Sequence, residues 1–466
     1  MKYILGADVG TTALKMVLFD ENGTEIKSFC KEYQLEVSGD CVELDAELYW
    51  QMFSKGFSEL SLEHEIYAMS IDTQCETLIV ADDDGIPLRK AIVWLDNRAE
   101  KQARRIEGDF GTQKVYEITG QPEVTATWPA CKLLWLKENE PEVFKRMGKI
   151  FLLEDYLLYK LTGKFITEKT LQSSSLYLDI RGGVWWNDML EYIGIGNSLL
   201  PELHGSGEVV GKYQSTFVIT GAIDQIAGAI GAGVVKEGIV SEMTGTTMVI
   251  FVPSPEMPDY DPSRKIPCHV NFDGKYCLMP WTSTAGVALK WFKNNFCEDF
   301  SLKELDEMAE KVPPGSCGLT FLPYLCGSNM PKYNPDAKGA FYGFTMEHTR
   351  AHAVRSILES VACMLKSNLS SLDIECNEIR SMGGGALSPL WCQIKADLTG
   401  KRLVTLKNSQ SACLGSAILA SVGVGIYPDV FTACKHIVKT GKEYEPKGNQ
   451  YSDAYKKFCD LEDKFL

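Results

Sequence analysis

The chain has 466 residues, more than a single hydrophobic core usually serves, so two or three domains are expected. Hydrophobic residues make up 45% of it and charged residues 23%, as in globular proteins, while the net charge of −15 argues against a nucleic acid or an anionic membrane as partner. No apolar run reaches the length of about 18 residues that a membrane span needs. Asp8 interrupts the apolar run at the N-terminus, so no signal peptide is predicted.

The first elements expected are two strands around a Gly-Thr-Thr sequence, which form a hairpin over residues 1–20. A further strand at 24–37 would give a three-stranded antiparallel start. Apolar residues at helical spacing predict an amphipathic helix over 45–63. The segment 66–80 is strand-like but interrupted, and 91–94 is a short buried strand. Strands followed by helices, with an antiparallel opening, indicate a mixed sheet of the α/β class.

The remainder of the first half is predicted to be helical at 97–107 and 141–163. Gly163 should close the second of these helices at its C-terminus. Residues 164–215 are expected to be rich in loops. A domain boundary is predicted near Gly221, where the chain becomes small and apolar.

The second half opens with alanines and glycines over 221–233, which permit close helix packing. A second hairpin with a Gly-Thr-Thr sequence follows at 238–251, and several prolines predict a loop at 253–267. A strand at 379–382 leads into three glycines. Helices are expected at 284–297, 301–311, 349–372, 389–399 and 412–423.

The two Gly-Thr-Thr sequences carry the first functional signal. They are Gly10-Thr11-Thr12 and Gly245-Thr246-Thr247. Glycine lets the backbone approach a ligand, and hydroxyls beside free N–H groups suit phosphate. A single hairpin of this kind is usually an ordinary turn. Two of them in corresponding places predict related half-molecules that hold a phosphate chain between them.

Asp8 ends the first strand two residues before the Gly-Thr-Thr sequence. A carboxylate beside bound phosphate is repulsive unless a cation separates them, so Asp8 is a candidate Mg²⁺ ligand, directly or through water. A turn-capping aspartate is the structural alternative. Lys15 could neutralise phosphate, although a solvated strand lysine is the favoured interpretation when Lys15 is taken alone.

Asp224 stands alone among small apolar residues at an expected helix N-terminus. It can be an N-cap, which aspartate fills well, or a general base that accepts a proton from a substrate hydroxyl. Phosphoryl transfer needs positioning and late proton acceptance rather than a strong base. The helix N-terminus is expected to keep this carboxylate ionised.

Two other patterns remain open. The three glycines at Gly383-Gly384-Gly385, followed by Ala386, would let a ring or a phosphate approach the backbone, or could be a plain loop. Their spacing excludes both the Rossmann and the P-loop motif. His348 and His352 have a metal-compatible spacing, but no third ligand is evident, so a structural pair on a helix is favoured.

Together these segments resemble the FGGY carbohydrate kinase family over essentially the whole chain. The segments that carry the resemblance include Asp8–Thr12, Trp94–Ala99, Lys132–Leu136, Asp155–Gly163, Gly221–Gly233, Thr244–Thr247, Gly339–Phe344 and Gly383–Trp391. The resemblance implies an α/β fold of two actin-like, or ribonuclease-H-like, domains, with mixed sheets flanked by helices and a cleft between the domains. The expected domains are 1–220, with the sugar site and the first phosphate motif, and 221–466, with the ATP site and the catalytic aspartate.

The resemblance also implies an ATP-dependent kinase that uses Mg²⁺ and phosphorylates a hydroxyl of a small sugar or polyol. Asp224 then corresponds to the catalytic base, and Asp8 to the acidic residue near the metal. The residues implied in ATP binding are Gly10, Thr11, Thr12, Lys15, Gly245, Thr246, Thr247, Gly384, Gly385 and Ala386. The residues implied in substrate binding are Gln74, Cys75, Glu76, Trp94, Asp96, Trp128 and Asp224.

The substrate is the weakest part of the resemblance. The chain resembles xylulose kinases at Trp94 and Asp96, which favours a ketopentose such as xylulose as substrate. Glu76 matches glycerol kinases instead, while Cys75 departs from both patterns. A carboxylate can accept two hydroxyl hydrogen bonds, which suits any polyhydroxy compound. A glycerol or tetritol kinase, and a nucleotide-binding sensor without activity, stay open as alternatives.

The fifteen cysteines include no Cys-x-x-Cys pair, so zinc-ribbon and redox-motif interpretations have no support. Reduced and mostly buried thiols in a cytoplasmic protein are expected. No nucleic acid and no membrane is expected as a partner, and a homodimer is left open.

Overall fold

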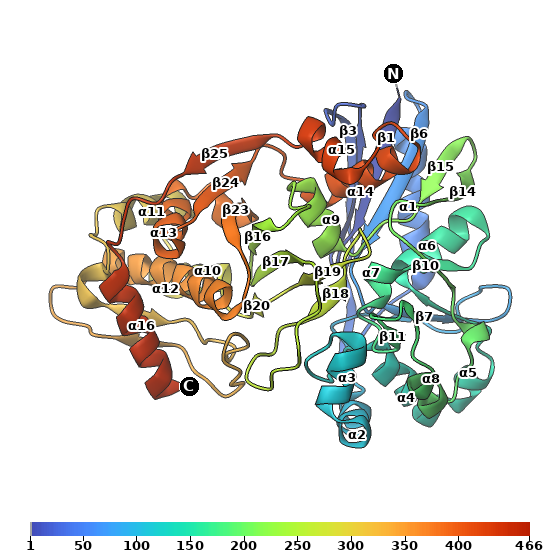
Figure 1. Ribbon diagram of the computed structural model, residues 1–466, viewed down its shortest axis with the longest axis horizontal. Helices are drawn as coiled ribbons and strands as arrows, with labels where there is room; N and C mark the ends of the chain where they lie inside the picture. The colour runs from blue at the N-terminus through green and yellow to red at the C-terminus, as the bar shows by residue number, and fades with distance from the viewer. Residues whose placement is uncertain (1) are drawn as a thin grey trace.

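The computed structural model describes residues 2–466, and most of their strands lie in two large sheets (Figure 1). The six-stranded first sheet has the order β14 (Val209–Tyr213), β15 (Thr216–Ile219), β6 (Ile66–Thr73), β1 (Tyr3–Val9), β2 (Ala13–Phe19) and β3 (Glu25–Glu32). β2 is antiparallel to both β1 and β3. β6 is parallel to β1, and β15 is parallel to β6. The predicted antiparallel opening of the chain is therefore confirmed.

The second sheet repeats this arrangement. Its path is β18 (Cys268–Val270), β19 (Tyr276–Leu278), β17 (Met248–Ser254), β16 (Gly238–Thr244), β23 (Cys376–Met382), β24 (Arg402–Leu406) and β25 (Thr440–Tyr444), with β20 (Trp281–Thr282) paired to β17. β16 is antiparallel to β17 and parallel to β23, and β24 is parallel to β23. The series β2-β1-β6-β15 thus matches β17-β16-β23-β24, which confirms an α/β fold built from two actin-like halves.

Two helices join the halves. α9 (Asp224–Gly231) and α14 (Ser411–Gly423) pack on each other, and α14 also packs on β1 and β6 (Figure 1). A Cβ added at Gly231 would lie 1.8 Å from the carbonyl oxygen of Ser411, and one at Gly415 would lie 1.8 Å from that of Ala227. Only glycine fits at such contacts. The prediction that the small residues of 221–233 permit close helix packing is therefore confirmed.

Further helices cover the outer faces of the sheets. α1 (Ala46–Leu60) packs on β2 and β3, and α6 (Leu153–Thr162) packs on β6, β14 and β15. In the second half α12 (Arg350–Ser371) packs on α13 (Pro389–Thr399), which contacts β24. The other helices are α2 (Glu100–Phe110), α3 (Thr112–Thr119), α4 (Pro129–Asn139), α5 (Pro141–Lys145), α7 (Lys169–Gln172), α8 (Asn187–Ile193), α10 (Gly286–Phe296), α11 (Leu302–Glu310), α15 (Val430–Ile437) and α16 (Ser452–Phe465), with 3-10 turns η1 (Asn197–Leu199), η2 (Ser316–Gly318) and η3 (Gly384–Leu387).

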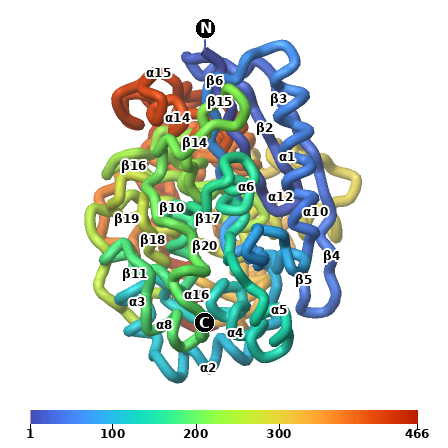
Figure 2. Tube along the Cα trace, turned by 90° about the vertical axis from the view of Figure 1, so that its right-hand side faces the viewer, coloured from blue at the N-terminus to red at the C-terminus, as the bar shows by residue number. Residues whose placement is uncertain are grey.

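Smaller sheets complete the fold. A five-stranded sheet joins β4 (Glu36–Ser38), β5 (Cys41–Leu44), β8 (Ala91–Ile92), β7 (Leu78–Ala81) and β9 (Lys149–Leu152). Two-stranded sheets pair β10 (Ile166–Glu168) with β13 (Glu202–His204), β11 (Leu178–Asp179) with β12 (Val184–Trp185), and β21 (Thr320–Leu322) with β22 (Ala340–Tyr342). Figure 2 shows α2, α3, α4 and α8 gathered at the end of the molecule opposite the N-terminus.

The prediction of one helix over 141–163 is wrong, because a strand interrupts it. α5 ends at Lys145, β9 follows, and α6 starts only at Leu153. Phe151 in β9 pairs with Ile79 in β7, so tertiary pairing turns this short apolar run into a strand. Gly163 does end α6, with φ of 71°. The predicted helix at 389–399 coincides with α13, whereas the loop-rich region 164–215 also holds α8 and several short strands.

The division of the chain at residue 220 stays a prediction. The last strand of the first sheet ends at Ile219, and the first strand of the second sheet begins at Gly238. All fifteen cysteines are free thiols, and most are buried, as expected. Over residues 2–466, no helix combines the length and the apolar character that crossing a bilayer requires.

Candidate active site

Three carboxylates meet where the first sheet approaches α9. Asp8, near the end of β1, lies directly beside Asp72 of the parallel strand β6. Asp224 is the first residue of α9, and the preceding Ile223 forms a parallel bridge with Thr73. Asp8 and Asp224 are partly exposed, whereas Asp72 is fully buried. The fold therefore brings together two aspartates that the sequence singled out and a third, Asp72, that it did not.

The charge of this cluster is unfavourable in the protein alone. Burial raises the pKa of Asp224 to about 8, and the neighbouring charge of Asp8 adds to the increase. Burial also raises the pKa of Asp8, and it holds the pKa of Asp72 well above its ordinary value. The expectation that the helix N-terminus keeps Asp224 ionised is therefore wrong, because burial and the charge of Asp8 outweigh the helix dipole.

Asp224 is also not the N-cap of α9. Ile223 holds that position, and Asp224 is the first helical residue. Its Oδ1 accepts one hydrogen bond, 2.8 Å long, from the backbone N–H of Gln225. Part of the carboxylate thus stays available to other donors, which fits a proton acceptor better than a saturated cap.

The donor set beside Asp8 suits a hard divalent cation. Oδ2 of Asp72 accepts a 2.6 Å hydrogen bond from the Ser416 hydroxyl, while Oδ1 of Asp72 is buried without a partner. Carboxylate oxygens are the ligands that Mg²⁺ prefers, and a cation would offset the repulsion between Asp8 and Asp72. Within residues 2–466 no three or more His, Cys, Asp or Glu side chains form a ready metal site, so water or phosphate would have to supply further ligands.

The first Gly-Thr-Thr turn connects β1 to β2. The N–H of Gly10 donates to Ala13 O (3.1 Å), and the carbonyl of Thr12 accepts from Tyr33 N (3.0 Å). Lys15 lies opposite Asp8 across the hairpin, and its charge partly offsets the effect of burial on the pKa of Asp8. Lys15 therefore acts on Asp8 electrostatically in this structure.

The second Gly-Thr-Thr turn connects β16 to β17 and rests on the start of α10. Gly286 N donates to Gly245 O (2.9 Å), and Ala285 N donates to Thr246 O (3.1 Å). A Cβ at Gly286 would lie 2.3 Å from Gly245 O. Sequence reasoning missed this role of Gly286, although a lone glycine at the start of an expected helix was visible.

The triple-glycine turn lies against the second Gly-Thr-Thr turn. Gly383 has φ of 74°, and a Cβ there would lie 2.7 Å from Thr244 O, next to Gly245. Gly384 is exposed, and Ala386 N donates to Gly383 O (3.2 Å). Two of the three segments predicted to bind nucleotide are thus neighbours in the second half, and the third lies with the carboxylates of the first sheet.

The segment Gln74-Cys75-Glu76 follows β6 directly. Glu76 has φ of 63°, a left-handed conformation that bulky residues rarely adopt. Burial raises the pKa of Glu76 to about 7, and the charge of Glu76 contributes to the raised pKa of Asp224. Cys75 Sγ donates to Glu76 Oε1 (3.3 Å), and Gln74 Nε2 donates to the Tyr49 hydroxyl (3.2 Å). Glu76 and Asp224 therefore act on one another electrostatically.

Lys132 holds this segment in place, and sequence reasoning assigned it no such role. Its buried Nζ donates to the backbone carbonyls of Glu76 (2.9 Å) and Val93 (3.0 Å). Burial lowers the pKa of Lys132 to about 8. One side chain thus fixes the backbone at Glu76 and the residue before Trp94.

Trp94, a predicted substrate-binding residue, contacts the first Gly-Thr-Thr turn. Its Nε1 donates to Thr11 Oγ1 (2.9 Å). Asp96 is fully buried, and its oxygens accept from the Arg98 guanidinium and from Val42 N (2.6 Å). Trp128 Nε1 donates to Glu123 O (3.1 Å). The structure therefore gives Asp96 structural partners, and direct contact of Asp96 with a substrate stays a prediction.

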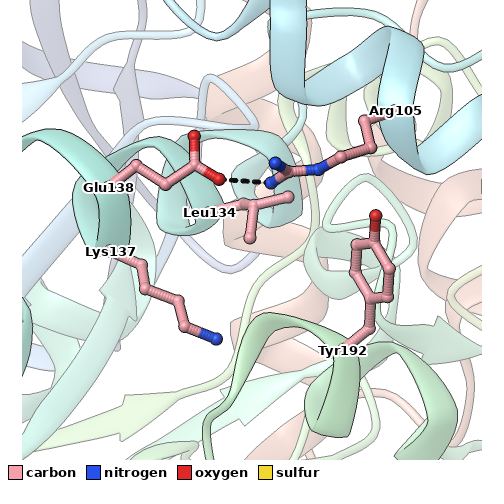
Figure 3. A pocket seen from close by; sticks show the side chains of 5 residues that line it. All are labelled: Arg105, Leu134, Lys137, Glu138 and Tyr192. Carbon is pink, nitrogen blue, oxygen red and sulfur yellow. Dashed lines mark hydrogen bonds and ion pairs between the residues drawn. The ribbon is translucent and has the colours of Figure 1, made fainter.

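Two other features lie outside this site. A hollow of about 470 Å³ lies between α2, α4 and α8. Figure 3 shows the side chains that line it, none of which is a predicted site residue: Arg105, Leu134, Lys137, Glu138 and Tyr192. The rings of His348 and His352 each accept a hydrogen bond at Nδ1, from Thr345 N (2.8 Å) and Thr349 N (3.2 Å). These contacts support the structural interpretation of the histidine pair, but His348 precedes α12, which begins at Arg350, so the two residues do not share one helix as expected.

Comparison with known proteins decides the family. The FGGY family of carbohydrate kinases, N-terminal domain, matches residues 3–236, and the C-terminal domain of the same family matches residues 241–424. The chain belongs to the FGGY family of carbohydrate kinases. It is thus a phosphotransferase with an alcohol group as acceptor, and the sugar kinases of this family use ATP, generally with Mg²⁺.

Three relatives illustrate the range within FGGY kinases. A xylulose kinase of Bacillus subtilis (strain 168) is 31% identical over 484 residues, which cover 99% of this chain and 96% of the relative. A gluconokinase of the same strain is 27% identical, with 95% of this chain and 92% of the relative covered. The crystal structure of ligand-bound xylulose kinase from Lactobacillus acidophilus has a TM-score of 0.92 and 26% identity, covering 100% of this chain and 98% of that one.

Proposed function

We propose that this FGGY kinase transfers the γ-phosphoryl group of MgATP to a hydroxyl of a ketopentose such as xylulose. The observation that carries the proposal is the grouping of Asp8 and Glu76 around Asp224, whose pKa both of them raise, next to the first Gly-Thr-Thr turn. The similarity to xylulose kinases over nearly the whole chain supports the same substrate class.

In the proposed reaction, Asp224 accepts the proton of the attacking hydroxyl. Phosphoryl transfer has a loose transition state, so orientation of that hydroxyl matters more than the strength of the base. Asp8, with Asp72 beside it, would hold Mg²⁺, which supplies charge neutralisation at the phosphates when bound. The backbone N–H groups of the two Gly-Thr-Thr turns would bind the phosphate oxygens, and closure of the cleft would exclude water.

The hydrogen bond from Trp94 to Thr11 suggests how the two substrates are coupled. Trp94 belongs to the predicted sugar site and Thr11 to the first phosphate turn. A sugar packed on Trp94 would therefore hold the orientation of the Thr11 hydroxyl. This contact supports a kinase with two substrates rather than a sensor that binds nucleotide alone.

Charge favours an uncharged substrate. The carboxyl groups of Asp8 and Glu76 act electrostatically on the proposed base Asp224, and Lys132, the buried cation that interacts with Glu76, donates to backbone carbonyls. An aldonate such as gluconate would bring a further negative charge to this site. Glu76 also suits glycerol or a tetritol, which remains the second candidate.

The decisive experiment is a panel of xylulose, other pentuloses and hexuloses, tetritols, glycerol and gluconate, assayed by coupled detection of ADP. We expect the highest kcat/KM with a ketopentose and negligible turnover with gluconate. Preference for glycerol or a tetritol would support the second candidate. If no compound of the panel stimulates ADP formation although ATP binds, the proposed substrate class is wrong.

The pH dependence of the reaction follows from the raised pKa of Asp224. Because the proton acceptor must be ionised and its pKa is about 8, kcat/KM should fall as the pH is lowered through that value, approaching about tenfold per pH unit. Glu76 raises this pKa, so Glu76→Gln should move the acidic limb to lower pH. Glu138→Gln, in the hollow of Figure 3, is the matched control and should leave the limb unchanged. If the acidic limb of the pH profile of kcat/KM stays at the same pH in Glu76→Gln, Glu76 and Asp224 do not interact.

Glu76→Gln should also weaken sugar binding. A hydrogen bond to a charged acceptor contributes about 1.5–3 kcal/mol, so KM for the sugar should rise about 10- to 100-fold while KM for ATP stays within about twofold. Initial rates with each substrate varied in turn measure both constants. An unchanged sugar KM would remove Glu76 from the substrate site.

A further inference from the structure

A second buried lysine lies in the other half of the molecule, next to the second Gly-Thr-Thr turn and the triple-glycine turn. The side chain of Lys395 on α13 is fully buried, and its Nζ lies 2.7 Å from Glu242 Oε1 and 2.9 Å from Thr244 Oγ1. The Thr244 hydroxyl donates to Glu242 Oε2 (2.6 Å), and the Ser381 hydroxyl donates to Glu242 Oε1. We refer to Glu242, Thr244, Ser381 and Lys395 as the Lys395 cluster.

The Lys395 cluster connects the second Gly-Thr-Thr turn to the triple-glycine turn. Thr244 is the last residue of β16, directly before Gly245. A Cβ at Gly385 would lie 2.7 Å from Thr244 Cβ and 3.1 Å from Lys395 Nζ. A Cβ at Gly383 would lie 2.7 Å from Thr244 O. Both glycines thus pack on cluster atoms with no room for a side chain, and the cluster sets the spacing of the two turns.

Stability alone does not explain such a cluster. Removing two charges from water costs more than their attraction commonly returns, and well-packed apolar residues of similar volume are often as stabilising. Hydrogen bonds differ from apolar packing because they fix both distance and direction. Lys395 and the carboxylate of Glu242 therefore hold β16, β23 and α13 in one register at the level of the two turns.

We propose that Lys395 and Glu242 are positioning residues for the nucleotide. They hold the turn at Gly245, which would bind phosphate, at a fixed distance from the turn at Gly384, which would bind the adenosine end. This inference rests on the proposed role of both turns in ATP binding. Both side chains are fully buried, so neither is expected to touch the nucleotide directly.

The test is equilibrium binding of MgADP to the whole chain without sugar, measured by calorimetry. Lys395→Met leaves Glu242 buried without its partner, so it should both destabilise the protein and weaken binding. The double variant Glu242→Gln/Lys395→Met removes both charges and should recover most of the thermal stability. We expect the Kd for MgADP to stay raised about tenfold or more in the double variant, because loosely held turns lose the productive geometry.

The matched control is Arg355→Met, which breaks another buried ion pair, with Glu359, in the same half of the molecule. It should lower the melting temperature without a selective change in MgADP affinity. The inference fails if the double variant binds MgADP as tightly as the unmodified protein, or if Arg355→Met weakens binding equally. If the unmodified protein binds MgADP but phosphorylates no sugar, that result counts against the proposed function and does not affect this inference.

Discussion

Asp224→Asn is expected to lower kcat for sugar phosphorylation by about 10³-fold, at the level of losing a positioned proton acceptor. Asparagine keeps the shape of the side chain and the acceptor for Gln225 N, so α9 should start as before. It cannot take up the proton of the attacking hydroxyl. Coupled ADP detection under saturating MgATP and sugar measures the loss, and MgADP binding should be retained.

A control separates this effect from damage to a helix terminus. Asp429 caps α15 by accepting a 2.6 Å hydrogen bond from Thr432 N, away from the carboxylate cluster. Asp429→Asn should leave kcat within about twofold, since asparagine also serves well as an N-cap. Near-normal turnover in Asp224→Asn would disprove the role of Asp224 as the base.

Asp8→Asn is expected to lower kcat by about 100-fold and to raise the Mg²⁺ concentration needed for half-maximal rate, as for loss of a metal-orienting group. The same change should stabilise the protein. The pKa of Asp8 is raised in the folded state, so its ionised form disfavours folding at every pH above the unfolded value. A neutral residue removes that cost, and the melting temperature at pH 8 should increase.

Lower activity together with higher stability is the signature expected of a carboxylate kept for function. Asp20→Asn is the matched control, since Asp20 follows the partner strand β2 and accepts turn hydrogen bonds from Asn22 N (2.9 Å) and Thr24 N (2.8 Å). It should change neither the Mg²⁺ dependence nor kcat. An Asp8→Asn protein with normal Mg²⁺ dependence would remove Asp8 from the metal site.

Several sequence predictions held because their signals are local. Apolar runs around Gly-Thr-Thr predicted both hairpins, and the helix at 389–399 was predicted to the residue. Such features depend on neighbours a few positions away, so periodicity and turn chemistry suffice. The prediction of one continuous helix over 141–163 was wrong because the apolar run Ile150–Leu152 is compatible with a strand as well as a helix. Pairing with β7 makes it a strand.

The surroundings of the charged side chains could not be predicted from the sequence. A helix N-terminus predicted an ionised Asp224, yet burial and the charge of Asp8 raise its pKa to about 8. Asp8 lies more than two hundred positions away along the chain, and burial itself is a property of the folded state. The partners of Asp96 were also not predictable, since its oxygens accept hydrogen bonds from Arg98 and from Val42, which is more than fifty positions away.

The sequence by itself determined the family and the α/β duplication, and it singled out Asp8 and Asp224 as candidates, because these depend on motifs whose order and spacing are readable along the chain. Only the tertiary structure decided which polar and charged side chains meet. Ser416 bonds to Asp72 across 344 positions, and Lys395 bonds to Glu242 across 153. Such partners have no local signal, because a hydrogen bond or a charge acts over a few ångströms in space whatever the separation along the chain.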